Sequence, residues 1–298
     1  MESYLLLFSL GAIALKLTLL VLRPKAIINA DRWLLCFFVG LLLANAVEAL
    51  VIAMLDMPGV MVVMVKAYYL ACGLSLLGVT VYSVSLVANS FKWTKPITLA
   101  LFAIYCGVVL FPGAGLAGVE KLGFSYTRIP GDYYPFIPLI LFAGLATVAL
   151  SLWRAHRGAS SSGRRKAMTL ALSCLPLVVA SVVVIGLMVF GFRINATFII
   201  SGASIITLWV LVLVDSNKRQ ETLLTYIPGS RENKLAMKMV AIFQAQSGGL
   251  DQSIKDIKSE LIDYILEEEG DNKSKAAKRL GISRQTLYRY AAEKNNKP

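Results

Sequence analysis

The sequence predicts an all-α protein in two parts, a bundle of seven transmembrane helices and a small helix-turn-helix domain. Two features of the composition lead to this prediction. Hydrophobic residues make up 57% of the 298 residues and charged residues only 16%, whereas soluble domains average about 45–50% apolar and about 25% charged residues. The charge is also uneven, because residues 1–214 hold 21 charged side chains and residues 215–298 hold 27. We therefore expect a membrane part followed by a soluble part.

Three regions follow from this boundary. We expect a seven-transmembrane bundle over residues 1–215, a cytoplasmic linker with an amphipathic helix over 216–249, and a dimerising helix-turn-helix domain over 250–298. A spanning helix needs about 20 mostly apolar residues. Seven runs approach this length, at 4–22, 33–55, 59–88, 96–111, 134–153, 168–191 and 196–214. Pro176 lies inside the sixth run, where we expect it to kink the helix.

Lysine and arginine in the short loops predict the orientation of the bundle. The first, third and fifth loops hold ten of these residues, and the second, fourth and sixth hold three. Because basic loops stay in the cytoplasm, the N-terminus should lie outside and the C-terminal tail inside the cell. We expect a multi-pass protein of the cell inner membrane, surrounded by lipid.

Three ionisable residues lie within the expected spans, where a charge is costly and often functional. Lys16 is close enough to the cytoplasmic end for its side chain to reach the interface. Glu48 and Lys66 lie at a similar depth, about 10 Å below the outer surface at a rise of 1.5 Å per residue, and Asn45 is one turn from Glu48. Glu48 and Lys66 should form either a structural ion pair or the polar floor of an outward-facing ligand pocket.

Aromatic residues gather toward the outer side of the expected bundle, among them Tyr69 and Tyr105. Belts of tyrosine and tryptophan are common at membrane interfaces, and the same residues would also suit the wall of a ligand pocket. The outer segment 112–132 is rich in glycine, so it is either a lid over such a pocket or a plain long loop.

The membrane part contains three short motifs. They are Gly131-Asp132-Tyr133-Tyr134, the basic run Gly163-Arg164-Arg165-Lys166, and Leu175-Pro176. With these motifs the region loosely resembles the seven-transmembrane N-terminal sensor domains of bacterial histidine kinases. The resemblance implies a sensor, but the 84 residues after the last span contain no histidine to act as a kinase phosphoacceptor.

The segment that follows Gly249 predicts an amphipathic helix. Apolar residues recur every three or four positions, at Leu250, Ile254, Ile257, Leu261 and Ile265. So wide an apolar face is typical of a helix that pairs with a second copy. Its other explanation is burial against the two helices that follow in the same chain.

Residues 271–290 fit the spacing of a helix-turn-helix. Ala277 is small enough for two helices to cross, Gly281 supplies the turn four residues later, and Ser283 can cap the second helix. Residues 272–298 carry eight Lys and Arg and one acid, whereas residues 251–271 carry two Lys and eight acids. The basic helices should therefore face phosphate, with the acidic helix turned away.

The core Gly270-Asp271-Asn272-Lys273-Ser274-Lys275-Ala276-Ala277 and the turn Leu280-Gly281-Ile282-Ser283-Arg284 resemble the Fis-type DNA-binding domain. The resemblance implies a dimer with two recognition helices in successive major grooves of a palindromic site. It places phosphate contacts at Asn272, Ser274 and Lys275, and groove-lining side chains at Ser283, Arg284, Thr286 and Arg289. Tyr288 stands where the family usually has a polar residue.

Together these features predict a membrane-bound one-component transcription regulator. It would sense an extracytoplasmic or intramembrane signal, such as a small-molecule or lipophilic ligand, and bind DNA as a homodimer. The alternative is a transporter or channel with a regulatory DNA-binding tail. The sequence contains no Walker A, HExxH or GxSxG motif, so we expect neither an enzyme nor a cofactor. All four cysteines lie in apolar runs without CxxC spacing, so we expect no metal site.

Overall fold

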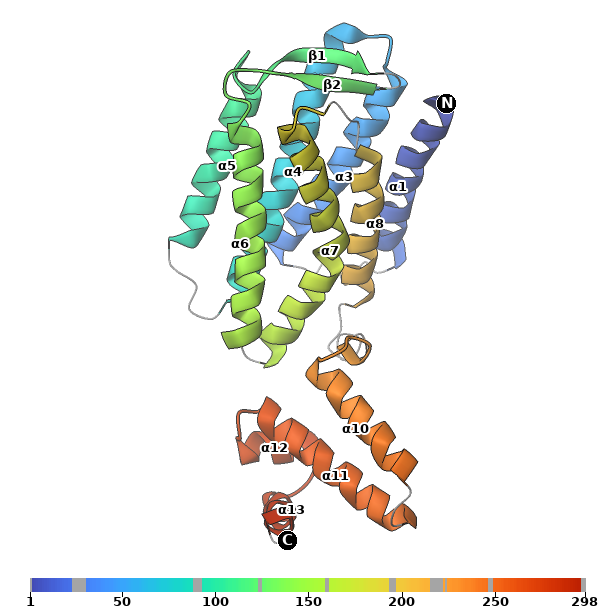
Figure 1. Ribbon diagram of the computed structural model, residues 1–298, viewed down its shortest axis with the longest axis vertical. Helices are drawn as coiled ribbons and strands as arrows, with labels where there is room; N and C mark the ends of the chain where they lie inside the picture. Colours follow the sequence, from blue (N-terminus) through green and yellow to red (C-terminus); the bar gives the residue numbers. More distant parts are fainter. Residues whose placement is uncertain are drawn as a thin grey trace. The chain divides into compact units, whose positions relative to one another are not determined.

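The computed structural model describes residues 2–22, 31–87, 93–122, 125–158, 161–192, 197–214, 222, 224–245 and 249–295. The chain divides into two compact units, Met1–Asp215 and Ser216–Pro298. The first unit is a helix bundle, whose helices run side by side (Figure 1). Its described helices are α1 (Glu2–Leu22), α3 (Arg32–Ala53), α4 (Pro58–Ser85), α5 (Thr94–Leu110), α6 (Phe136–Gly158), α7 (Ser161–Val189) and α8 (Thr197–Leu213).

Four of these helices are long and apolar enough to cross a membrane. Their apolar stretches are Arg32–Ala53, Gly59–Ser85, Phe136–Arg157 and Gly163–Leu187. Three further apolar helices are shorter, at Leu6–Leu19, Thr94–Leu110 and Ile199–Val212. Length and composition thus support four spans among the described helices rather than the seven predicted.

Small residues bring α3 and α4 into close contact. A Cβ atom placed on Gly40 would lie 2.7 Å from the backbone nitrogen of Ser75, and one placed on Gly78 would lie 2.5 Å from that of Phe37. Small residues at a helix crossing permit such close backbone packing. We infer that α3 and α4 are tightly fitted at these two glycines.

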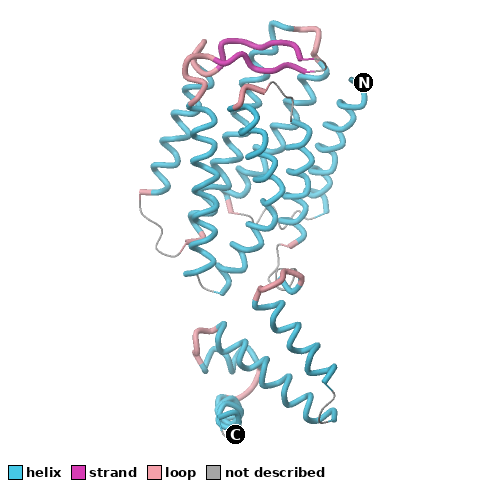
Figure 2. The backbone as a smooth tube through the Cα atoms, viewed as in Figure 1, coloured by secondary structure: helices cyan, strands magenta, loops and turns pink. Residues whose placement is uncertain are grey.

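The described fold is mostly all-α, as predicted, with one exception: residues 116–122 and 125–130, in the segment expected to be a lid or a plain long loop, form a β-hairpin. Strands β1 (Leu116–Leu122) and β2 (Ser125–Pro130) pair antiparallel and lie across one end of the bundle (Figures 1 and 2). The Tyr126 hydroxyl donates to the Leu55 carbonyl at 3.0 Å, and Lys121 lies 3.9 Å from Asp56. Both contacts attach the hairpin to the turn between α3 and α4.

The second unit, Ser216–Pro298, which we call the tail unit, consists of amphipathic helices around a small core. Its described helices are α10 (Arg231–Ala245), α11 (Gly249–Glu268), α12 (Lys273–Leu280) and α13 (Arg284–Asn295). The buried residues of its hydrophobic core are Ile262, Ile265, Ala276, Ala277 and Leu287. The expected linker helix is α10, which packs against α11 through ion pairs between Lys238 and Glu260 at 2.7 Å and between Arg231 and Glu267.

Candidate nucleic-acid interface and cavity

Helices α12 and α13 form a helix-turn-helix whose ends are defined by side-chain and backbone caps. The Asn272 side chain accepts a hydrogen bond from the Lys275 amide at 3.2 Å, and Ser283 Oγ accepts one from the Thr286 amide at 3.1 Å. Between the helices Gly281 has a φ of 66°, a left-handed conformation that glycine adopts without a steric penalty. The sequence therefore sets both helix starts and the turn.

The contact between α12 and α13 is fixed by three almost fully buried side chains. Ala276, Ala277 and Leu287 are 0%, 2% and 0% exposed. Alanine at the crossing lets the helices approach, while Leu287 fills the space between them and α11. This packing holds α13 at one angle to α12, as a recognition helix requires.

Most of the predicted DNA-contacting side chains are accessible. Lys275, Arg284, Tyr288 and Arg289 are exposed, and Ser274 and Thr286 are half-buried. Asn272 and Ser283 are exposed as well, but their side-chain oxygens accept the capping bonds of α12 and α13.

The first turn of α12 contacts α13 through a side-chain pair that the sequence pattern does not indicate. Lys273 Nζ lies 4.5 Å from the centre of the Tyr288 ring, a cation–π contact. Tyr288 thereby holds a cation beside the recognition helix, which gives a structural role to the residue that departs from the family pattern. No short-range sequence pattern marks a contact between residues 15 positions apart, so only the fold reveals it.

The acidic side of α11 neutralises part of the basic charge. Arg279 lies 2.7 Å from Glu268 and 3.1 Å from Glu269, so its charge is used within the domain. Lys275 of α12 and Arg284 of α13 are exposed and form no ion pair with any described residue. They are the better candidates for phosphate and base contacts.

The predicted dimer residues have different surroundings in a single copy. Ile265 is 7% exposed and packs in the core of its own domain, so it is unavailable to a second copy. Ile254 is 39% exposed and Leu261 is 36% exposed, and Ile257 is half-buried. A dimer seam along α11 would therefore use the first half of this helix.

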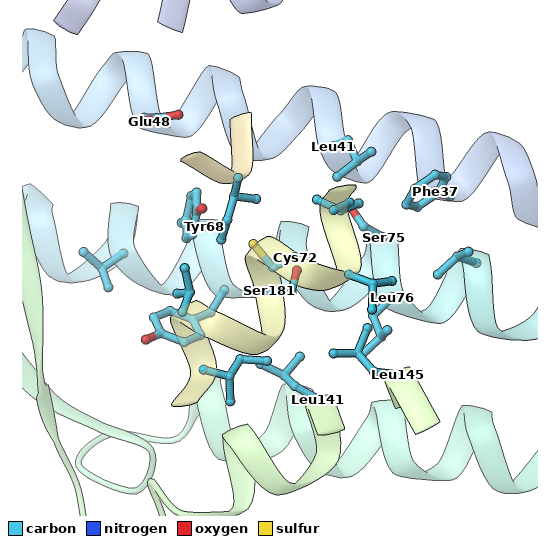
Figure 3. A pocket seen from close by; sticks show the side chains of 18 of the residues that line it. Phe37, Leu41, Glu48, Tyr68, Cys72, Ser75, Leu76, Leu141, Leu145 and Ser181 are labelled. Carbon is cyan, nitrogen blue, oxygen red and sulfur yellow. The ribbon is translucent and has the colours of Figure 1, made fainter. Parts of the chain in front are cut away.

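The helix bundle contains a cavity of about 220 Å³ between α3, α4, α6, α7 and the hairpin. Figure 3 shows Phe37, Leu41 and Glu48 along one helix and Tyr68, Cys72 and Ser75 along another. The wall of the cavity is mainly apolar, with a few polar residues from the helices, and the hairpin adds Thr127 and Arg128.

Two of the five predicted pocket residues line this cavity, Glu48 and Tyr69. Tyr105 is 1% exposed and donates its hydroxyl to the Tyr69 carbonyl at 2.7 Å, which joins α5 to α4. The predicted Glu48–Lys66 pair is not formed, although both residues are described. Lys66 Nζ donates instead to the Leu110 carbonyl at 3.0 Å, because this face of α4 is turned toward the end of α5.

Glu48 belongs to a different polar network, which includes the remaining predicted residue, Asn45. Asn45 donates to Glu48 at 3.2 Å and to Ser201 of α8, and Ser201 donates to Glu48 at 2.7 Å. Lys16 Nζ donates to Asn45 and, at 3.1 Å, to the Leu41 carbonyl. Lys16 is 0% exposed, so the expectation that it reaches the interface is wrong: it is retained by these acceptors.

Residues 253–289 match the family described as bacterial regulatory protein, Fis family. The match begins in α11, includes α12 and ends in α13. A search of curated proteins and a search of solved structures found no match. The helix-turn-helix is thus of the Fis type, which indicates a DNA-binding transcription regulator rather than an enzyme.

Proposed function

We propose that the chain is a membrane-bound one-component transcription regulator of the cell inner membrane, with its helix-turn-helix tail in the cytoplasm. The observation that carries the proposal is the union in one chain of a Fis-type helix-turn-helix with a bundle of apolar helices. The uneven distribution of basic loops supports a cytoplasmic tail. All seven helices of the bundle would cross the bilayer, the shorter ones with polar flanks at the interface.

The proposed DNA complex follows from the geometry of the domain. Arg284 is the first residue of α13, and the first residues of a recognition helix reach base edges in the major groove. Lys275, on the first helix of the motif, would contact phosphate. A two-fold dimer would place two such helices on the half-sites of a palindrome, about one helical turn apart.

Dimerisation would use apolar side chains that a single copy leaves exposed. Leu250 is 71% exposed and Ile254 is 39% exposed on α11, and Phe243 is 60% exposed on α10. Exposed apolar side chains grouped in so small a domain favour a protein partner, and a second copy satisfies the symmetry of the DNA site.

Signal transmission would pass through the polar network. Glu48 lines the cavity and shares a hydrogen bond with Ser201 on α8. Helix α8 is the last of the bundle, and the tail unit follows it in sequence. A ligand that shifts the equilibrium of this contact would bias the position of α8 and, through it, the geometry of the tail dimer.

The test is DNA binding by the full chain in lipid nanodiscs, with selection from random duplexes followed by titration on the selected site. Arg284→Ala should weaken binding to that site by about 1–3 kcal/mol and reduce discrimination against random DNA. Lys275→Ala should weaken both alike and reduce the salt slope by about one unit.

Arg231→Ala is the matched control, because Arg231 pairs with Glu267 outside the helix-turn-helix. It should leave sequence preference unchanged. Equal losses in all three variants, or no selected sequence at low salt, would disprove the assignment.

A further inference from the structure

The cavity in the helix bundle has an elongated apolar part. On α3 its lining residues run from Phe37 to Val51, a separation of 14 residues, which is about 21 Å at the rise of an α-helix. Aliphatic side chains from α6 and α7 form the facing wall, among them Leu141, Leu145 and Leu177. An apolar cavity of about 150 Å³ is known to stay dry and bind benzene, so this larger one offers room for an apolar ligand.

The end of the cavity beneath the hairpin carries a cation. Arg128 lines the cavity from β2. Its Nε donates to the Tyr134 hydroxyl at 2.8 Å, its Nη1 donates to Thr127 at 3.5 Å, and its guanidinium lies 5.5 Å from the centre of the Tyr134 ring. These partners are all neutral, so they orient the guanidinium without cancelling its charge. A guanidinium presents paired donors suited to a carboxylate.

Glu48 is the one carboxylate among the described residues that line the cavity, and it is already hydrogen-bonded. Glu48 accepts hydrogen bonds from Asn45 and Ser201, and Lys16 is bound to the same network. It is therefore not available to neutralise Arg128. Among the described residues that line the cavity, Arg128 is the one cation and has no carboxylate partner. Such a cation at one end of a long apolar space matches a ligand with one negative charge and one apolar tail.

We propose that this cavity binds a single-chain amphiphile with an ionised carboxylate, of the fatty-acid class, with the head group at Arg128 and the alkyl chain between α3, α4, α6 and α7. The proposal gives a ligand class to the sensor function above and rests on that function for its biological meaning. One cation favours the single charge of a carboxylate over the near-double charge of a phosphate monoester.

The experiment measures binding of radiolabelled palmitate to the full chain in phosphatidylcholine nanodiscs, with empty nanodiscs as background. Wild-type protein should bind palmitate saturably and should prefer it at least tenfold over palmityl alcohol, because a charge-assisted bond is lost with the alcohol. Arg128→Gln should weaken palmitate at least tenfold and leave the alcohol unchanged. Arg128→Lys should retain part of the preference. Lys121→Gln, which removes a cation from the same hairpin at an exposed position, should have no effect.

A second pair of variants tests the position of the chain. Leu145→Trp fills the cavity and should abolish saturable binding, whereas Leu139→Trp changes a 61% exposed side chain of the same helix and should not. Binding that is unaffected by Arg128→Gln and Leu145→Trp would refute the site, as would a preference for an alkyl phosphate. DNA binding is measured separately on the same samples. A chain that binds palmitate but no DNA would refute the regulator, and one that binds DNA but no palmitate would refute only the ligand class.

Discussion

Replacing Lys16 with methionine and Glu48 with glutamine, singly and together, tests whether the network between α1, α3 and α8 contains a working ion pair. Lys16 is 0% exposed and Glu48 is 6% exposed, and Asn45 bridges them. If only neutral hydrogen bonds mattered, each would contribute about 0.6 kcal/mol in a membrane protein, so losing the two Lys16 bonds would cost about 1 kcal/mol. Removing one partner of a buried pair costs about 3–5 kcal/mol instead, because the other charge stays buried without compensation.

We therefore expect Lys16→Met and Glu48→Gln each to lower the free energy of unfolding by about 3–5 kcal/mol. The double variant should lose about 2 kcal/mol less than the sum of the two, within the usual range for interacting residues. The assay is unfolding in mixed micelles by increasing dodecyl sulfate, followed by the reactivity of Cys174, which is 3% exposed in the folded chain.

Lys66→Met is the matched control for these variants. Lys66 is half-buried and donates one hydrogen bond to a carbonyl, so its loss should cost less than about 1 kcal/mol. The reasoning fails if Lys16→Met is no more damaging than Lys66→Met, or if the two single effects simply add.

Three further predictions concern packing, the turn and orientation. Gly78→Val should destabilise the bundle by about 1–3 kcal/mol or more, since its Cβ would meet the Phe37 backbone at 2.5 Å. Gly186→Val should be tolerated, because a Cβ there meets nothing within 4 Å. Similar thermal midpoints for the two variants would count against close α3–α4 packing. Gly281→Ala should cost the tail unit about 1–2 kcal/mol because of its positive φ, measured by urea unfolding of residues 216–298; an unchanged midpoint would contradict the left-handed turn. A fluorescent protein fused after Pro298 should fluoresce and a periplasmic phosphatase there should be inactive; the reverse result would place the tail away from DNA.

Local patterns predicted the elements well. Each described helix of the bundle overlaps one expected apolar run, because a run of about 20 apolar residues is a property of one segment. The helix-turn-helix was equally accessible, because Asn272, Gly281 and Ser283 define its ends within a short stretch. Sequence did not reveal the hairpin, since the glycines of residues 112–132 concealed strand formers such as Val119 and Ile129.

Partners across the bundle could not be predicted. Glu48 and Lys66 have similar predicted depths because each is seven residues from the outer end of its predicted span. The rise per residue does not indicate which face of a helix meets which neighbour. The fold turns Glu48 toward α1 and α8, where Lys16 and Ser201 lie, and Lys66 toward α5. Arg128 was counted only as a loop charge, and its place in the cavity follows from the hairpin that the sequence did not predict.

The tight α3–α4 contact and the proline in α7 give the cavity one stiff wall and one more flexible wall. Phe37 and Leu41 lie on α3, which the glycine contacts hold against α4, so this side resists displacement. The facing wall includes α7, where Pro176 lies between the lining residues Cys174 and Leu177. Proline has no backbone N–H, so Pro176 cannot donate the helical hydrogen bond to the carbonyl four residues earlier. We therefore expect a bulky ligand to displace α7 rather than α3. Among ligands of equal length, a wider ligand would bend α7 more. We therefore expect the width of the ligand, rather than its length, to set how far α7 moves.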